Sequence, residues 1–530
     1  MIDKIKAIED RRRYLLQGGG TKEVDRQHQQ GKLTSRERLA RLFDEGTFQE
    51  IDLWIRPIKT GFDIDERDLP GDAVITGFGK IHGRTIYAYI HDFTVVGGTM
   101  SSGQDHKVTR LMEMAMEARA PYVGIVDSGG VRIHDLFGRP AFRPIQAGRL
   151  GIGGTTGIFA APSIASGVIP QITVMLGPCY AGSAYSPTLA DFVIMRRGIS
   201  FMSVASPQLL KTVTYKDVTQ GEIGGAELHA TVTGTADYLS ETDEEAIDFC
   251  RELLTYLPLN NRQFSPIIET GDDLNRRDDN LLKIVPFDLS QPYDMHEVIH
   301  SIVDNGQFLE LQGLFAKSII IGFGRLGSQT VGIVANNRAE DNGSLNINTC
   351  DKEARFIRFC DCFNIPIVFL VDTPGFLSSI EEERSRDGLI RTAARPVFAI
   401  CEASVPMIGV YIGKCFGPAR LIMGTPRLGV DIVYSWPSAQ VARMNPEEAV
   451  NIIYKQEIAS SKDPEKVRSE KLRDLLKNYI NFPYHAAEQL MVNEIIDPRD
   501  TRPVLIKTLK TLGNKEPHPR PWKKHSLIPR

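Results

Sequence analysis

The sequence has little excess charge and no long apolar run. Its 62 Lys and Arg residues nearly balance 66 Asp and Glu residues, for a formal net charge of −4. This balance argues against a protein that mainly binds nucleic acid or an anionic membrane. No stretch approaches the roughly 20 apolar residues that cross a bilayer, and the acidic Asp3, Glu9 and Asp10 are unlike a signal or transit peptide. We therefore expect a cytoplasmic protein.

Cysteine is scarce, and histidine pairs with metal-ligand spacing are missing. The closest of the seven cysteines, Cys360 and Cys362, lack the two-residue spacer of a zinc or thioredoxin motif. None of the eleven histidines forms a helical metal-binding pair, so we expect His91, His106 and His134 to be structural. The sequence predicts reduced thiols and no metal site.

Two segments resemble familiar motifs but lack a feature that each motif needs. Residues 322–327 match the dinucleotide fingerprint Gly-x-Gly-x-x-Gly, but a strand at Thr330–Val334 follows where a helix should begin. Ser128 lacks the glycine that stands two residues before a hydrolase nucleophile, because Val126 occupies that position. The first segment is therefore not expected to bind a nucleotide, and the second is predicted to be a tight turn at the end of a strand.

A duplicated strand and turn is the most informative feature present. Residues 169–182 are repeated at 405–418 with one offset (405 − 169 = 236), which pairs Gly177 with Gly413 and Cys179 with Cys415. Gly77-Phe-Gly79 recurs at Gly322-Phe-Gly324, and Asp127 recurs at Asp372, at a shared offset of 245 (322 − 77 = 372 − 127). Self-similarity over a domain-sized period indicates two similar folds.

The chain of 530 residues is long enough for two such domains. We place the first at 1–265, a polar linker at 266–288 and the second at 289–530. A helical segment at 5–42 is expected first, with a capping box at Thr34-Ser-Arg-Glu37. Strands are expected at Ala73–Ile75, Thr85–Ile90, Tyr122–Val126 and Ile172–Leu176, helices at Asp105–Ala118 and Ala246–Tyr256, and a solvated helix within 460–478.

The two glycine turns carry the chemical prediction. A strand that leaves through such a turn into a helix start presents free backbone N–H groups, which can hold a carbonyl oxygen as it becomes negative. One copy is explained equally well by packing of a buried strand. Two copies favour a site that polarises two carbonyls at once, and such a donor is commonly worth about 3 kcal/mol of barrier.

Ordered motifs along nearly the whole chain give a resemblance to a known family. They include Gly18-Gly-Gly20, Gly31-Lys-Leu-Thr-Ser-Arg-Glu-Arg38, Asp92-Phe-Thr-Val-Val-Gly-Gly98, Asp127-Ser-Gly-Gly-Val-Arg-Ile133, Asp372-Thr-Pro-Gly-Phe376 and Lys523-Lys-His525. At these residues the sequence resembles the carboxyltransferase (beta) subunit of biotin-dependent acyl-CoA carboxylases, the family of the propionyl-CoA carboxylase beta subunit.

The resemblance implies an α/β fold of tandem duplicated crotonase-like domains with a β-β-α superhelix. It implies a homo-hexamer, a trimer of dimers, in which the N-terminal half of one subunit faces the C-terminal half of another. Members move a carboxyl group between biotin, held on a separate carrier protein, and the α-carbon of an acyl-CoA. The chain has no Met-Lys-Met biotinylation signature and no Gly-rich ATP-binding segment, so the biotin carboxylase and carrier partners are expected to be separate chains.

The resemblance also assigns roles by position. Ala181 and Gly182 would supply N–H donors for the thioester carbonyl, and the turn from Gly417 to Ala419 would face the biotin ureido oxygen. The substrate-binding positions are Gly129, Gly130 and Arg132 beside CoA and Leu421 in the acyl pocket. An arginine suits the CoA phosphates, but a surface salt bridge is the alternative for Arg132.

The chain departs from the family in both turns. The family commonly reads Ala-Tyr-Gly-Gly-Ala-Tyr at the second turn, whereas this chain reads Cys-Phe-Gly-Pro-Ala-Arg over 415–420. Pro418 has no N–H to donate; alternatively, it begins the following helix while Gly417 and Ala419 hold the oxygen. Ala181 replaces a usual glycine. The segment 378–387 is longer than usual, and Pro396 predicts a kink or early end in its helix.

Three other functions stay open. The first is a related decarboxylase that runs the transfer in reverse. The second is a crotonase-like lyase that acts without biotin. The third is a catalytically silent scaffold paralogue that completes a ring. The sequence does not identify the acyl group, because Leu421 indicates only an apolar pocket wall.

Overall fold

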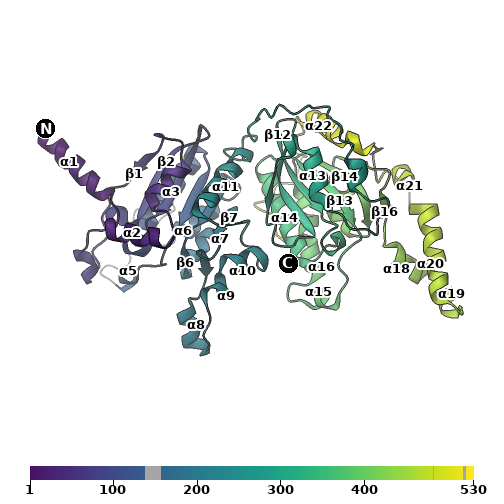
Figure 1. Cartoon of the computed structure of the whole chain (residues 1–530), viewed down its shortest axis with the longest axis horizontal. Helices are drawn as coiled ribbons and strands as arrows, with labels where there is room; N and C mark the ends of the chain where they lie inside the picture. The colour runs from purple at the N-terminus through teal and green to yellow at the C-terminus, as the bar shows by residue number, and fades with distance from the viewer. Residues whose placement is uncertain (138–156, 481–482, 517–520, 530) are drawn as a thin grey trace. The chain divides into compact units, whose positions relative to one another are not determined.

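A computed structural model describes residues 1–137, 157–480, 483–516 and 521–529. The chain divides into two compact units, Met1–Phe264 (unit 1) and Ser265–Arg530 (unit 2), which lie in the purple-to-teal and green-to-yellow parts of Figure 1. The polar segment expected as a linker groups with unit 2. Within it, the Ile268 N–H donates to the Ser328 carbonyl, and the Thr270 hydroxyl donates to Asp304 at 2.9 Å.

Unit 1 is built on a seven-stranded sheet. Its order is β1-β2-β3-β4-β5-β7-β9, antiparallel from β1 to β3 and parallel from β3 onward. A separate parallel pair is formed by β6 and β8. The strands are β1 Gln49–Ile51, β2 Val74–Ile81, β3 Arg84–His91, β4 Tyr122–Val126, β5 Gln171–Met175, β6 Pro178–Tyr180, β7 Phe192–Arg196, β8 Phe201–Ser203 and β9 Tyr238–Ser240.

Unit 2 repeats this arrangement. Its sheet has the order β10-β11-β12-β13-β14-β15-β17, with β16 paired to the end of β14. The strands are β10 Phe308–Leu311, β11 Ile319–Leu326, β12 Gln329–Asn336, β13 Ile367–Thr373, β14 Met407–Phe416, β15 Ile432–Ser435, β16 Gln440–Ala442 and β17 Glu494–Ile495. The single strand β14 corresponds to β5 and β6 together, which confirms the duplication read from the sequence.

The repeated glycines explain why both sheets begin alike. A Cβ on Gly77 would lie 2.3 Å from the Gln49 carbonyl oxygen and 2.5 Å from the Phe48 ring. A Cβ on Gly322 would likewise lie 2.3 Å from the Leu309 oxygen and 2.6 Å from Phe308. Only glycine leaves room for the aromatic ring beside the strand, so each unit has a glycine at this position opposite a phenylalanine.

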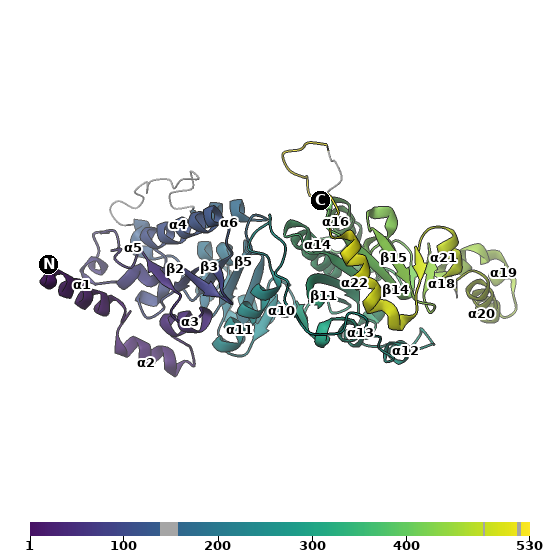
Figure 2. The same ribbon diagram turned by 90° about the horizontal axis from the view of Figure 1, so that it is seen from above.

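Helices cover both faces of each sheet. In unit 1, α4 and α6 lie on one face and α3 and α11 on the other, and in unit 2 α14 and α16 lie opposite α13 (Figure 2). The unit 1 helices are α1 Ile2–Leu15, α2 Thr21–Gln29, α3 Ser35–Leu42, α4 Ser102–Ala118, α5 Ile133–Phe137, α6 Gly157–Ala165, α7 Tyr185–Thr188, α8 Pro207–Thr214, α9 Gln220–Gly224, α10 Ala226–Thr231 and α11 Asp243–Tyr256. The unit 2 helices are α12 Leu281–Ile284, α13 Met295–Ile302, α14 Ile347–Cys362, α15 Ile380–Arg384, α16 Leu389–Glu402, α17 Ala419–Ile422, α18 Pro446–Ile453, α19 Lys455–Ser460, α20 Pro464–Leu475, α21 Tyr484–Glu488 and α22 Thr501–Leu512.

Several local predictions are confirmed and one is wrong. The capping box joins Thr34 and Glu37 at the start of α3. The fingerprint at 322–327 lies in β11 and its hairpin turn, and α20 has no buried residue. Of the two outcomes expected at Pro396, a kink or an early end, the early end is wrong, because α16 continues to Glu402. Among the described residues, no helix is both long and apolar enough to span a membrane.

Candidate active site

The two predicted turns have the same backbone shape. Ala181 follows β6 with a φ of 53°, and Gly417 follows β14 with a φ of 63°, at the offset of 236 found in the sequence. This left-handed conformation suits glycine, whereas an alanine pays about 1 kcal/mol or more for it. The first turn therefore holds a strained residue where the second holds a relaxed one.

The first turn leaves two amide hydrogens available. The N–H groups of Ala181 and Gly182 donate to no other residue in the described part of the chain. The Ser183 hydroxyl fixes the turn by donating to the Tyr180 carbonyl at 2.6 Å. Among the described residues, a Cβ on Gly182 would meet only the Phe159 ring, at 3.7 Å, so no described residue crowds the free amides.

The second turn has a different set of donors. The Gly417 N–H donates to the Ala442 carbonyl on β16 at 3.1 Å, which corrects the expectation that this amide is free. Pro418 has no N–H, and α17 begins at the next residue, Ala419. The amides of Ala419 and Arg420 donate to no described residue. The two free amides of the second turn therefore lie two positions later in the chain than those of the first turn, at the offset of 236.

A pocket of about 810 Å³ lies beside the second turn. Its walls are mostly apolar, and a few polar side chains stand at one side. The lining includes Gly417, Pro418 and Leu421, the apolar Phe376, Leu389 and Val397, and the polar Arg443, Asn445 and Glu448. Leu421 therefore lies on a pocket wall, and the long segment 378–387 contributes Ser378 and Glu383 to the lining.

A buried aspartate packs behind each turn. A Cβ on Gly177 would lie 1.8 Å from an Asp127 carboxylate oxygen, and a Cβ on Gly413 would lie 2.1 Å from one of Asp372. The backbone N–H of each aspartate is held from the preceding strand, by His91 Nδ1 at 3.4 Å and by Asn336 Oδ1 at 3.1 Å. These repeated glycines are needed so that the carboxylates can fit against the strand.

The two aspartates have different partners. Asp127 binds Lys32 at 2.6 Å and Arg38 at 2.8 Å, and both cations are buried. Asp372 accepts from the Tyr293 hydroxyl at 2.9 Å and the Lys414 N–H at 2.8 Å, with Arg338 at 3.8 Å. Burial raises the pKa of Asp372 and that of Tyr293. Sequence reasoning assigned no role to Lys32 or Arg38.

The histidine between these elements is structural. Burial lowers the pKa of His91 to about 4, so the ring is neutral and its Nδ1 accepts the Asp127 N–H. Among the described residues, no three His, Cys, Asp or Glu side chains are grouped so that they could hold a metal.

The predicted substrate turn lies next to the first donor turn. The Gly129 N–H donates to the Gly97 carbonyl at 2.8 Å, and the Gly130 carbonyl accepts from Met100 at 2.8 Å. A Cβ on Gly130, which has a φ of 94°, would lie 3.4 Å from Tyr180. Gly129 and Gly130 are thus brought to the residue that precedes Ala181.

Arg132 does not serve as a free cation there. Its guanidinium binds Asp72 at 2.7 Å and the Thr99 side chain and carbonyl, and its side chain is 3% exposed. This ion pair corrects the expectation that Arg132 is free for a CoA phosphate. Ser128 is also structural, as predicted, because its buried hydroxyl donates to the Gly98 carbonyl at 2.8 Å.

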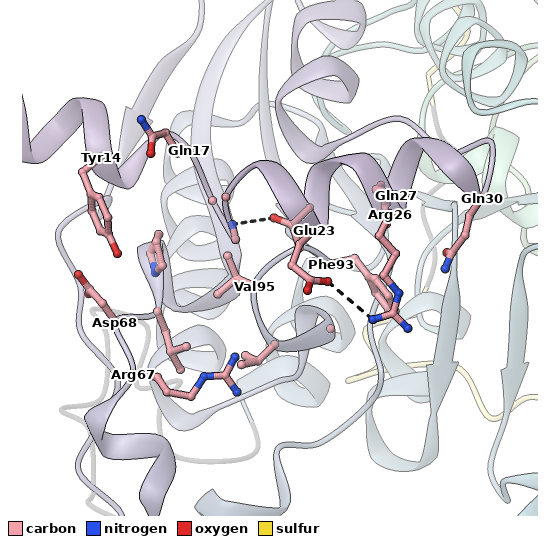
Figure 3. Close-up of a pocket in the computed structure, with 18 residues that line it drawn as sticks. Tyr14, Gln17, Glu23, Arg26, Gln27, Gln30, Arg67, Asp68, Phe93 and Val95 are labelled. Atoms are coloured by element: carbon pink, nitrogen blue, oxygen red, sulfur yellow. Dashed lines mark hydrogen bonds and ion pairs between the residues drawn. The ribbon is translucent and has the colours of Figure 1, made fainter.

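A polar pocket of about 600 Å³ borders the same turn and was not predicted from the sequence (Figure 3). Gly97, the acceptor for Gly129, lines it together with Gly18, Gly19 and Gly20. Arg67 extends along one side of it, and Arg26 lies 3.7 Å from Glu23 at another. No described carboxylate lies within ion-pair distance of Arg67, and the Phe93 ring also lines the pocket.

Comparisons with known proteins agree with this geometry. The model of the carboxyl transferase domain family matches residues 26–528. The chain is 42% identical to the propionyl-CoA carboxylase carboxyltransferase subunit of Haloferax mediterranei, over 100% of this chain and 99% of that protein. It is 41% identical to the methylmalonyl-CoA decarboxylase subunit alpha of Veillonella parvula, over 99% of each.

A solved structure has the same fold. The transcarboxylase 12S, described as a hexamer with methylmalonyl-coenzyme A and methylmalonic acid bound, superposes with a TM-score of 0.92 at 38% identity and covers 100% of this chain and 98% of that one. The tandem crotonase-like architecture expected from the sequence is therefore confirmed.

Proposed function

The chain belongs to the carboxyl transferase domain family, and from this premise we propose that it transfers a carboxyl group between carrier-bound biotin and the α-carbon of propionyl-CoA or methylmalonyl-CoA. The observation that carries the proposal is the repeated turn with two free amides in each unit. Two carbonyl oxygens become negative during such a transfer. Preorganised N–H donors stabilise that charge without a side-chain base.

The first turn is proposed to hold the acyl-CoA. The amides of Ala181 and Gly182 would donate to the thioester oxygen and stabilise it as the α-carbon gains negative charge. Gly130 lies against Tyr180, directly before these donors, so a thioester at the turn has the predicted substrate-binding glycines beside it.

The second turn is proposed to receive biotin. Biotin supplies the ureido nitrogen that carries the carboxyl group. A pocket of about 810 Å³ with mostly apolar walls fits a small fused ring system. The amides of Ala419 and Arg420 are free to donate to a ureido oxygen, and Leu421 forms part of the wall.

The polar pocket of unit 1 is proposed to take the nucleotide end of CoA. It borders the Gly129 turn through Gly97, and Arg67 offers a guanidinium with no described counter-ion. Guanidinium groups bind phosphates well, and the Phe93 ring, which has the Lys32 ammonium 4.3 Å from its centroid, lines the same pocket. Since Arg132 is held by Asp72, Arg67 replaces it as the proposed phosphate contact.

We further propose a homo-hexamer that works with a separate biotin carrier and biotin carboxylase. The transcarboxylase 12S is described as a hexamer, and this chain covers 98% of its length. Light scattering of the purified chain would test the assembly, and a stable monomer at working concentration would contradict it.

One experiment tests the main proposal. The purified chain is incubated with free biotin and either malonyl-CoA or methylmalonyl-CoA, and the decarboxylated thioester is measured with and without avidin. We expect product formation that requires biotin and that avidin blocks. Turnover without biotin would favour the lyase, and no turnover with any acyl-CoA would favour a silent scaffold.

The CoA proposal has its own control. Arg67→Ala should raise the KM for methylmalonyl-CoA about tenfold, the loss of one charge-assisted phosphate contact, and leave the KM for methylmalonyl-pantetheine unchanged. Arg13→Ala, which removes an exposed arginine paired with Asp10 on α1, should change neither. An equal effect of Arg67→Ala on both substrates would contradict phosphate binding.

The methylmalonyl-CoA decarboxylase relative favours a second candidate, in which the chain runs the transfer in reverse. The subunits that co-purify with the chain distinguish carboxylation from decarboxylation. Co-purification with an ATP-dependent biotin carboxylase supports carboxylation, whereas co-purification without one supports decarboxylation.

A further inference from the structure

A small cavity of about 20 Å³ lies beside the first donor turn. Cys179 and Ser183, which flank the two free amides, line it together with side chains from β3, β4, α4 and α6. One part of the wall is apolar and includes Met100, Val108, Val126 and Ile158, and the other is polar and includes His91, Gln104 and Asp105. A cavity of this size has room for about one water-sized group.

Gln104 places a buried acceptor on the wall. Its side chain is 1% exposed, and its Nε2 donates to the Ala73 carbonyl at 3.3 Å and to the Gly98 carbonyl at 3.5 Å. These two bonds fix which end of the amide is the donor. Its Oε1 has no hydrogen-bond partner in the described part of the chain. Such an oxygen costs stability unless a group in the cavity donates to it.

The Asp105 carboxylate is a second acceptor. Its Oδ1 accepts from the Ile158 N–H at 3.1 Å and from the Thr109 hydroxyl at 3.4 Å. Its Oδ2 accepts from no described residue, and no described cation lies within ion-pair distance. Burial raises the pKa of Asp105 to about 6, so the group is an ionised acceptor at pH 8.

His91 places a donor on the same wall. Its Nδ1 accepts the Asp127 N–H at 3.4 Å, and the ring is neutral because burial lowers its pKa to about 4. The ring proton is therefore on Nε2. That nitrogen donates to no described residue, so the polar wall offers two acceptors and one donor.

We propose that this cavity binds one ordered water molecule, which donates to Gln104 Oε1 and to Asp105 and accepts from His91 Nε2. Water has this combination of two protons and a lone pair. An anion has no proton for the two acceptors, and a cation has no lone pair for the imidazole N–H. Buried waters of this kind commonly make about three hydrogen bonds.

Each partner of the water also holds a support of the first turn. His91 holds the backbone of Asp127 behind the turn. Gln104 holds the Gly98 carbonyl beside the substrate turn. Asp105 holds the start of α6, which packs against α7 after the donor turn. The water joins these supports, so Gln104 and Asp105 act through it as positioning residues. This role rests on the proposed function of the first turn.

The second unit lacks both acceptors. At the offset of 245, Gln104 corresponds to Thr349 and Asp105 to Cys350. The Thr349 hydroxyl is used in the capping box of α14, where it donates to the Asn346 carbonyl at 2.8 Å. The water site therefore belongs to the first turn alone.

A high-resolution crystal structure of the full chain without substrate tests the site. We expect a single water peak within about 2.7–3.2 Å of Gln104 Oε1, of an Asp105 oxygen and of His91 Nε2. An absent peak, or a water that misses either acceptor, would overturn the inference.

Val108→Ile tests the role of the water, because it extends an apolar side chain into the cavity. Val193→Ile, at a buried position on β7 outside the cavity wall, is the matched control. Displacement of the water should lower the melting temperature more than the control does. It should also lower kcat for carboxyl transfer about tenfold at a nearly unchanged KM for methylmalonyl-CoA, whereas the control should leave kcat unchanged.

Two results would contradict this account. A Val108→Ile variant that melts above the native chain would show that the cavity is dry, and an unchanged kcat would remove the positioning role. If the native chain transfers no carboxyl group, the proposed function fails, while the water peak and the melting temperatures still decide whether the site exists.

Discussion

The two donor turns share a frame but differ in the amides they offer. Each follows a parallel strand, has a left-handed residue at its start and rests on a buried aspartate. The first offers Ala181 and Gly182, whereas the second has lost one N–H to Ala442 and one to proline, and offers Ala419 and Arg420. The comparison teaches that duplication fixed the scaffold, while each copy acquired its own donors.

The aspartates behind the turns differ in the same way. Asp127 is neutralised by two buried cations, whereas Asp372 is held mainly by a tyrosine hydroxyl and a backbone amide, and its pKa is raised by burial. The same carboxylate position thus carries a full ion-pair network in unit 1 and a weaker one in unit 2.

The largest effect is expected from removing the charge of the aspartate behind the first turn. Asp127→Asn should destabilise the protein by about 3–5 kcal/mol, because it leaves Lys32 and Arg38 buried and uncompensated. Asp372→Asn should cost about 1–2 kcal/mol, since an amide oxygen can still accept from Lys414. Urea unfolding at pH 7 measures both, with Asp248→Asn, an exposed partner of Arg41, as a control of little effect. Equal losses at positions 127 and 372 would contradict the distinction.

A second comparison sets α4 against α14. Lys107 and Lys352 correspond and are both buried, where they donate to backbone carbonyls. The next positions differ, because Val108 is replaced by Glu353, which is 0% exposed and has no partner for either carboxyl oxygen. Burial raises the pKa of Glu353 well above its ordinary value of 4.5.

The sign of the resulting pH dependence follows from this pKa. Above pH 4.5 the unfolded chain releases a proton that native Glu353 keeps, so the free energy of unfolding falls as pH rises, by up to about 1.4 kcal/mol per pH unit. Glu353→Val copies the first unit and should remove this slope. Urea unfolding at pH 5.5 and 8 should show that Glu353→Val is more stable than the native chain and that the difference in unfolding free energy grows with pH. A difference independent of pH would contradict the assignment.

The smallest effect is expected at the strained residue of the first turn. Ala181→Gly relieves the left-handed strain but increases the entropy of the unfolded chain, so a net stabilisation of about 1 kcal/mol or less is expected. Ala115→Gly inside α4 is the matched control and should destabilise by about 1 kcal/mol. A loss at Ala181 as large as the control would show that the alanine is not strained.

The sequence predicted the features that depend on local pattern or on repetition. The strand at Tyr122–Val126, the capping box at Thr34 and the paired glycines 177 and 413 are visible because each leaves a signal in neighbouring residues or in both copies. Contacts between distant segments left no such signal. Arg132 meets Asp72 across 60 positions, and the Gly417 amide is taken by Ala442 on a strand that pairs only in the folded unit.

The most direct test of the account exchanges the two turns. Ala181→Gly combined with Gly182→Pro gives unit 1 the Gly-Pro turn of unit 2 and removes one proposed donor, with Pro418→Gly as the reciprocal variant. If main-chain amides carry the chemistry, biotin-dependent carboxyl transfer should fall about 100-fold or more in the first variant at an unchanged melting temperature, and change only modestly in the second. A loss of less than tenfold in a folded first variant would contradict the claim that the turn donates its amides to the reacting carbonyl.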